Sequence, residues 1–294
     1  MDHKSFLKAL SAEEKATLTE TEDAAGLWHL AGHLGLILGC GALIAAKVPL
    51  WWALLPVQGV LMVFLFTLEH ECTHKTPFRS PALSEWVGRL CGMVLLLPFE
   101  WFRYFHLAHH RHTNIPGLDP ELATDKPETL AWWLWHVSGL PYWTAGVRLM
   151  AALVMGQTKG EYLPQSARPR IVREARVMAV LYLGLAATLV WSPLILWAWI
   201  VPVLIGQPAL RLYLLAEHGD CPRVADMFEN TRTTFTNRIV RFVAWNMPYH
   251  AEHHVFPAVP FHKLPALHVR MREHLKVTAD GYAAFTRDYL DRRM

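Results

Sequence analysis

The sequence predicts an all-α integral membrane protein, with four transmembrane helices in two hairpins and a cytoplasmic helical cap that holds clusters of histidines. Three observations predict this class. The 294-residue chain is 53% hydrophobic and only 18% charged, whereas soluble domains carry about 25% charged residues. The apolar residues are gathered into long stretches, each holding two segments of about 20 residues, enough to cross a bilayer. Three short histidine clusters lie beside apolar segments.

The first 25 residues are polar and contain five Asp and Glu residues between positions 13 and 23. A cleaved signal peptide needs a basic start followed at once by an apolar core. We therefore expect 1–25 to be a cytoplasmic N-terminal segment, 26–275 to be the membrane domain, and 276–294 to be a polar C-terminal tail.

Two nearly uncharged stretches form the predicted hairpins. The first is interrupted only at Lys47 and Pro49, and the second is broken at Ser192 and Pro193. The predicted spans are 26–46, 48–68, 175–191 and 194–216. Between the hairpins, 86–99 is too short to span a bilayer, and the tryptophan-rich stretch 130–155 is typical of a helix lying at the membrane surface.

The loops between paired spans contain a single basic residue, Lys47, whereas the other faces are rich in Lys and Arg. The positive-inside rule then places both termini and all histidine clusters on the cytoplasmic side of a multi-pass protein. No basic arm or known nucleic-acid motif is found in the sequence, and the modest net charge of +3 does not indicate a nucleic-acid partner.

Eight histidines recur at helical spacing, as one H-x-x-x-H and two H-x-x-H-H motifs. Side chains at i, i+3 and i+4 project from one face of a helix, where their imidazoles can share a metal. Eight ligands exceed what one ion uses, so two metals are predicted. The predicted ligands are His70, His74, His106, His109, His110, His250, His253 and His254.

Imidazole binds iron, zinc and copper, so the ligand type alone does not choose the metal. The number of histidines at a membrane face favours a di-iron centre that uses O₂. One alternative is a zinc protease, because His70, Glu71 and His74 satisfy H-E-x-x-H; it leaves both H-x-x-H-H motifs without a role. A carboxylate-type di-iron bundle needs two E-x-x-H motifs, and Glu71 to His74 supplies only one.

The three clusters, in this order and with their intervening hairpins, resemble the histidine boxes of the membrane fatty acid desaturase and hydroxylase superfamily over about residues 26–275. The resemblance implies two Fe ions, O₂ as co-substrate, and an amphiphilic substrate such as a lipid. Desaturation of a fatty acyl chain is the first expectation; a hydroxylase, or a desaturase of a non-acyl small molecule or carotenoid, is the alternative. No cytochrome b5 motif or ferredoxin cysteine set is found in the sequence. An external donor of the ferredoxin or cytochrome b5 type, with its reductase, is therefore expected.

Further site residues are predicted from their positions. His218 closes the last span at the same face and depth as His70 and is expected to be a ninth ligand. Glu71, Asp119 and Glu252 lie near the clusters and are expected to hold ligating histidines, and Asn246 could hold a water on the less crowded iron. His29, His33 and His112 are not expected to bind metal.

Overall fold

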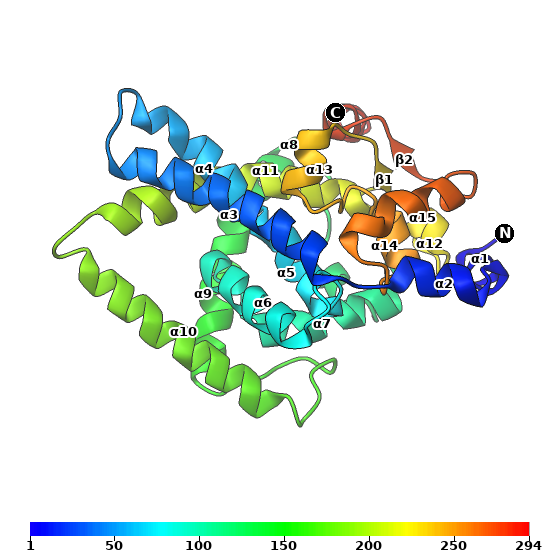
Figure 1. Cartoon of the computed structure of the whole chain (residues 1–294), viewed down its shortest axis with the longest axis horizontal. Helices are drawn as coiled ribbons and strands as arrows, with labels where there is room; N and C mark the ends of the chain where they lie inside the picture. Colours follow the sequence, from blue (N-terminus) through cyan, green and yellow to red (C-terminus); the bar gives the residue numbers. More distant parts are fainter. Residues whose placement is uncertain (294) are drawn as a thin grey trace.

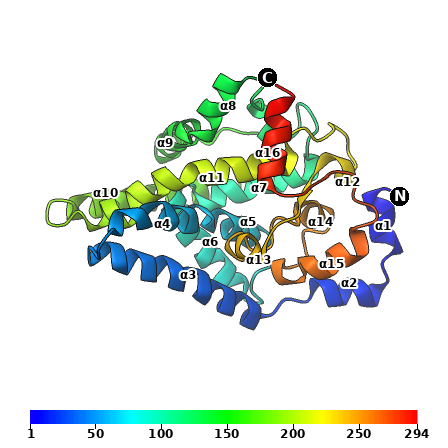
Figure 2. The ribbon, with the colours of Figure 1, turned by 90° about the horizontal axis from the view of Figure 1, so that it is seen from above.

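The computed structural model describes residues 1–293, which are mostly helical. The elements that form the long axis of the molecule are α3 (Asp23–Ala45), η1 (Trp51–Ala53), α4 (Leu54–Val63), α5 (Leu65–His74), η3 (Leu196–Ile200) and α11 (Val201–His218). In Figure 2, α3, α4 and α11 lie beside one another along this axis. The tips of the α3–α4 hairpin and of α10 (Arg168–Thr188) project together on the left in Figure 1.

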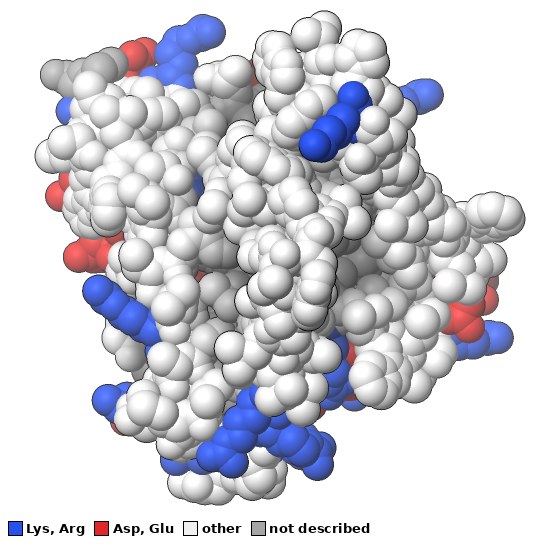
Figure 3. Space-filling view, turned by 90° about the vertical axis from the view of Figure 1, so that its left-hand side faces the viewer, with Lys and Arg blue, Asp and Glu red and all other residues white. Residues whose placement is uncertain are grey.

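Three helical segments are long and apolar enough to cross a membrane: Ala12–Ala45, Trp51–His74 and Leu196–His218. They overlap the predicted spans 26–46, 48–68 and 194–216. The remaining predicted span, 175–191, falls largely in α10, which is not one of the three segments. Figure 3 shows the projecting face as mostly uncharged, with blue side chains gathered at its lower edge. By length and composition the candidate spans number three, or four if a sharply bent helix pair counts as one span.

That bent pair consists of α6 (Pro81–Leu95) and α7 (Phe99–His112), which meet at an angle of 100°. Leu96 ends α6 in a left-handed conformation (φ 59°), and Pro98 starts α7. Across the bend, Arg89 donates to Glu100 at 2.8 Å. A buried charge-assisted hydrogen bond of this kind is stronger than a neutral one, so the bend holds α7 in a fixed direction toward the centre of the molecule.

Helices α4 and α11 cross at two glycines. A methyl group on Gly59 would lie 2.2 Å from the carbonyl oxygen of Pro202, and one on Gly206 would lie 2.3 Å from the carbonyl carbon of Gly59. Small residues let membrane helices approach closely enough for backbone contact. The crossing brings the C-terminal half of α11, and with it His218, to the same end of the bundle as α5.

We expect Gly59→Ala to destabilise the folded chain by about 1–3 kcal/mol, because the new methyl group meets backbone atoms that cannot move independently. Gly35→Ala on α3 is the matched control, since a methyl group there meets no atom within 4 Å. The thermal midpoints of the two purified variants would be compared in the same detergent. Equal midpoints would contradict the close crossing.

Helices outside the main axis complete the fold. Between α7 and η3 lie η2 (Pro120–Ala123), α8 (Leu130–Val137), α9 (Leu140–Val154) and α10. The cap contains α12 (Met227–Asn230), α13 (Arg238–Val243), α14 (His250–Val255), η4 (Phe261–Lys263), α15 (Leu264–Met271) and α16 (Tyr282–Asp291), with β1 (Thr233–Thr234) parallel to β2 (Thr278–Ala279). The predicted surface stretch 130–155 thus forms two helices, which meet at Gly139 (φ 76°).

The N-terminal helices α1 (His3–Ala9) and α2 (Ala12–Thr19) pack on this cap, at the right in Figure 1. The ring of Phe6 meets that of Phe228 edge-on at 5.8 Å, and Nδ1 of His3 lies 3.0 Å from Asp226. Lys263 donates to the carbonyl of Thr17 at 2.6 Å. The polar N-terminal segment is therefore part of the same packed structure as the histidine-bearing cap.

Candidate metal centre

Four helices bring the nine predicted histidines together: α5, α7, α11 and α14. Five of them offer ring nitrogens that all lie within 4.8 Å of one another: His70, His74, His106, His110 and His253. A second group meets the same limit: His109, His218 and His254. His250 joins the second group, because its Nε2 lies 3.1 Å from Nε2 of His218. The nine side chains thus divide into five and four.

Nitrogen pairs within each group are spaced like ligands of a common ion. In the first group, Nε2 of His74 lies 2.9 Å from that of His106, and Nε2 of His110 lies 3.2 Å from that of His253. Two nitrogens that bind one ion at about 2.1 Å and at right angles are about 3.0 Å apart. The donor set therefore fits metal ions of this size.

The two groups are direct neighbours. His109 and His110 are consecutive in α7, yet each contributes to a different group. The rings of His110 and His254, one from each group, stack with centroids 4.0 Å apart. Because α7 and α14 both supply residues to both groups, the H-x-x-H-H spacing links the two sites. This arrangement suits a dinuclear centre better than two separate single-ion sites.

Burial keeps the three histidines of α14 neutral. Burial holds the pKa values of His250, His253 and His254 well below the ordinary value for histidine. Only neutral imidazole can donate a lone pair to a metal. The protein environment thus keeps these ligands ready to bind.

Asp119 lies beside His109, the contact expected of a carboxylate that orients a ligating ring. Both carboxylate oxygens lie 3.0 Å from Nδ1 of His109, which leaves Nε2 for the metal group. Burial acts to raise the pKa of Asp119, but hydrogen bonds from His109 and from the backbone N–H of Asn114 and Glu121 outweigh it and lower that pKa. The carboxylate is therefore charged. Such a partner orients a ligating ring and increases its basicity.

Other ring nitrogens also face polar atoms. Oε1 of Glu71 lies 3.5 Å from Nδ1 of His253, and Oε1 of Glu217 lies 3.4 Å from Nδ1 of His250. Two further partners were missed by sequence reasoning, Thr113 and Asn230. Oγ1 of Thr113 lies 3.1 Å from Nδ1 of His254, and the carbonyl of Asn230 accepts from Nδ1 of His218 at 3.1 Å. The sequence could have indicated Thr113, because it lies four residues after His109. It could not have indicated Asn230, because the contact is made by its backbone.

The contacts of Glu252 differ from the predicted ones, and those of Asn246 leave its predicted role untested. Glu252 accepts from Thr233 at 2.6 Å and contacts Nδ1 of His268, so its partners are these residues and not a clustered histidine. The reason is that Glu252 points away from the histidine-bearing face of α14. The amide nitrogen of Asn246 donates to the carbonyl of Phe261 at 3.1 Å. It therefore braces the cap, and a water-holding role remains a prediction for its amide oxygen alone.

The histidines that were not expected to bind metal lie outside both groups. His29 contacts the carbonyl of Phe242 at 2.7 Å. Nε2 of His33 contacts the carbonyl of Leu61 at 2.9 Å, while its Nδ1 accepts from Trp245 at 3.1 Å. These two rings are satisfied by structural hydrogen bonds. His112 is half-buried at the end of α7.

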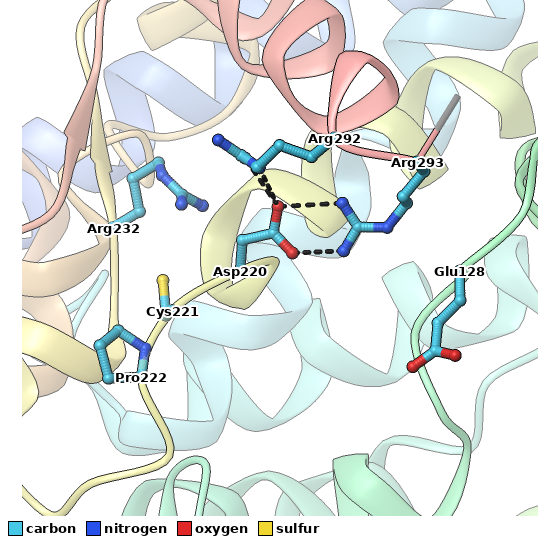
Figure 4. A pocket seen from close by; sticks show the side chains of 7 residues that line it. All are labelled: Glu128, Asp220, Cys221, Pro222, Arg232, Arg292 and Arg293. Carbon is cyan, nitrogen blue, oxygen red and sulfur yellow. Dashed lines mark hydrogen bonds and ion pairs between the residues drawn. The ribbon is translucent and has the colours of Figure 1, made fainter.

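Two arginines that directly follow α16 bind the turn after α11. Figure 4 shows Asp220, two residues after His218, between the guanidinium groups of Arg292 and Arg293. Arg232, at the back of the same hollow, donates to the carbonyl of Ala216. These contacts hold the turn after α11, and so the position of His218. The hollow has a volume of about 710 Å³.

We expect Asp119→Ala to weaken iron retention by about 10- to 100-fold, the usual effect of removing a carboxylate behind a metal-binding histidine. Asp119→Asn should give most of this loss, because it keeps an oxygen for the backbone donors but removes the charge. Glu121→Ala, an exposed carboxylate 3.7 Å from the same ring, is the control. The measurement is the amount of iron per chain after dialysis against a chelator. If all three variants retained as much iron as the parent chain, Asp119 would have no role in the site.

Comparison with known proteins identifies the class to which this fold and site belong. Residues 49–286 match the family model for fatty acid desaturases. The chain therefore belongs to the fatty acid desaturase family, whose members are membrane oxidoreductases. The family that the histidine clusters indicate in the sequence is thereby confirmed.

Individual relatives are similar over shorter or more divergent stretches. An sn-1 oleoyl-lipid 12-desaturase of Arthrospira platensis is 24% identical over 78% of this chain and 71% of its own length. An sn-1 acyl-lipid omega-3 desaturase (ferredoxin) of Synechocystis is 31% identical over 34% of the chain and 29% of its own length. A sphingolipid delta(4)-desaturase/C4-monooxygenase of Mus musculus is 26% identical over 67% of the chain and 58% of its own length. In the last two, less than two thirds of the relative is matched.

Proposed function

We propose that this chain is an O₂-dependent di-iron membrane enzyme that desaturates an unactivated C–C bond of a fatty acyl or lipid substrate. One observation carries the proposal: nine histidines from four helices, eight of them buried and His74 half-buried, form two adjoining groups of five and four. The unequal division leaves one ion with fewer protein ligands and room for O₂. Relatives named as acyl-lipid desaturases support the substrate class.

The chain's own residues supply the surroundings of this chemistry. The first iron would be held by His70, His74, His106, His110 and His253, and the second by His109, His218, His250 and His254. When bound, the irons would activate O₂ with two external electrons for hydrogen removal from carbon. Asp119 orients His109, and the apolar packing around the centre excludes bulk water. Both termini and the centre would lie on the cytoplasmic side, where a donor protein has access.

The electron donor would be a separate protein of the ferredoxin or cytochrome b5 type, with its reductase. The name of the Synechocystis relative, which includes ferredoxin, supports the first type. The second candidate outcome is hydroxylation, which the name of the mouse relative keeps open because it covers both a desaturase and a monooxygenase. A non-acyl small molecule or a carotenoid is the alternative substrate.

The zinc protease alternative is less well supported. In that chemistry Glu71 would act as a general base beside an open metal position. Here Oε2 of Glu71 accepts from Thr76 at 2.9 Å and from the backbone N–H of Phe261 at 3.1 Å. Its other oxygen lies toward His253. A carboxylate held in this way joins α5 to the cap, and this structural role does not require the chemistry of a general base.

The test is a mass-spectrometric comparison of lipids and polar metabolites from host cells that express the chain or its His253→Ala variant, each with a ferredoxin and reductase. A product that lacks two hydrogens and depends on His253 supports desaturation. A product that gains one oxygen supports hydroxylation instead. Identical lipid and metabolite profiles, with iron bound and the donor shown to reduce it, would overturn the proposal.

A further inference from the structure

A cleft on the outer side of α10 is separate from the metal centre. It lies between the first half of α10 and the chain that follows α9, and has a volume of about 620 Å³. Gly156, Thr158 and residues of α10 line it. The lining residues of α10 recur at intervals of three and four from Pro169 to Leu181, so they form one stripe on the helix. α10 contributes no histidine to either metal group.

The lining of this cleft is both basic and apolar. Arg168, Arg173 and Arg176 contribute to it, and no Asp or Glu is among the residues that line it. Val172 lies among these arginines, and Val177, Val180 and Leu181 continue the lining beyond them along α10. From residue 177 to residue 191 the chain has no charged side chain. The cleft therefore crosses the boundary at which α10 changes from a basic helix to an apolar one.

The arginines are available for an anionic ligand. Within residues 1–293, none of the three forms an ion pair with a carboxylate. Nε of Arg168 is buried without a hydrogen-bond partner in the same part of the chain. Arg176 is fixed in place, because its Nε donates to the carbonyl of Val154 at the end of α9 (3.0 Å). An unpartnered donor in the lining of a cleft is open to a ligand that can accept from it.

We propose that this cleft binds a membrane phospholipid with an anionic headgroup. The guanidinium groups match the fork geometry of a phosphate, and the valines and Leu181 match an acyl chain of the same molecule. Basic clusters beside membrane helices attract anionic lipids in this way. Figure 3 shows blue side chains gathered at the lower edge of a mostly uncharged face, at the height where Figure 1 has the first half of α10. A free phosphate would leave the apolar half of the cleft unused.

The experiment measures lipid retention by native mass spectrometry of the full chain, delipidated in detergent and then mixed with dioleoyl-phosphatidylglycerol or dioleoyl-phosphatidylcholine. The parent chain is expected to retain one phosphatidylglycerol and little phosphatidylcholine. Combined Arg168→Gln, Arg173→Gln and Arg176→Gln should lower retention at least about tenfold. The control variant, Arg79→Gln with Arg238→Gln and Arg272→Gln, removes the same charge from exposed positions elsewhere and should retain lipid like the parent.

A second variant, Val172→Trp, fills the cleft without removing charge and should also lose the lipid. This variant tests lipid binding in the cleft if the triple variant does not fold. Iron content should be unchanged in every variant. Equal lipid retention in parent and cleft variants would overturn the proposal, as would an equal loss in the control variant. Displacement of the lipid by millimolar inorganic phosphate would assign the arginines to free phosphate instead.

Discussion

His218→Ala is expected to lose iron and to reduce turnover by more than about 100-fold, because even the partners behind metal-binding histidines are worth about 10- to 100-fold. His218 belongs to the smaller group, where Nε2 of His109 lies 3.2 Å away and Nε2 of His250 lies 3.1 Å away. Removing one of only four ligands leaves too few to hold the second iron. Iron per chain and product formed with a reduced donor are the two measurements.

Two control variants separate metal loss from misfolding. His29→Ala removes a ring that contacts the carbonyl of Phe242, and His112→Ala removes a half-buried ring next to the cluster. Both should keep iron and turnover near those of the parent chain. The role of His218 would be refuted by a folded His218→Ala protein that retains two irons and full activity.

The purified chain is expected to hold close to two irons after reconstitution under reducing conditions. The physical reason is the number of donors: nine imidazoles in two groups exceed what one ion can coordinate. Metal analysis by inductively coupled plasma mass spectrometry gives the ratio. Chelation should remove the metal and the activity together, and iron(II) should restore both.

A different metal content would favour another chemistry. One tightly bound zinc per chain, with cleavage of a peptide substrate, would establish the protease that His70, Glu71 and His74 suggest. One iron per chain after full reconstitution would show that the groups of five and four act as a single site.

The sequence predicts the histidines of this site because their spacing is local. His106, His109 and His110 meet on one face of α7 wherever that helix is placed. His218 could be added because a helix of known length carries its last residue to a defined depth. Both arguments use only helical geometry and the thickness of a membrane.

The division of these residues between two groups depends on tertiary packing. Neighbours such as His109 and His110 go to different groups because α5, α11 and α14 approach α7 from different sides, which no local pattern encodes. Asn230 contacts His218 through a backbone carbonyl, an atom that every residue has. Glu252 is adjacent to His253 in sequence, yet it faces Thr233 and His268.

The distribution of the nine histidines along the chain also bears on biogenesis. The first of these histidines is His70 and the last is His254, so every apolar helix is synthesised before the set is complete. Neither group of histidines is complete before α14 folds against α5 and α7. If these groups hold metal, loading would be a late event, and a chain arrested before residue 250 would leave its earlier histidines without their partners from α14.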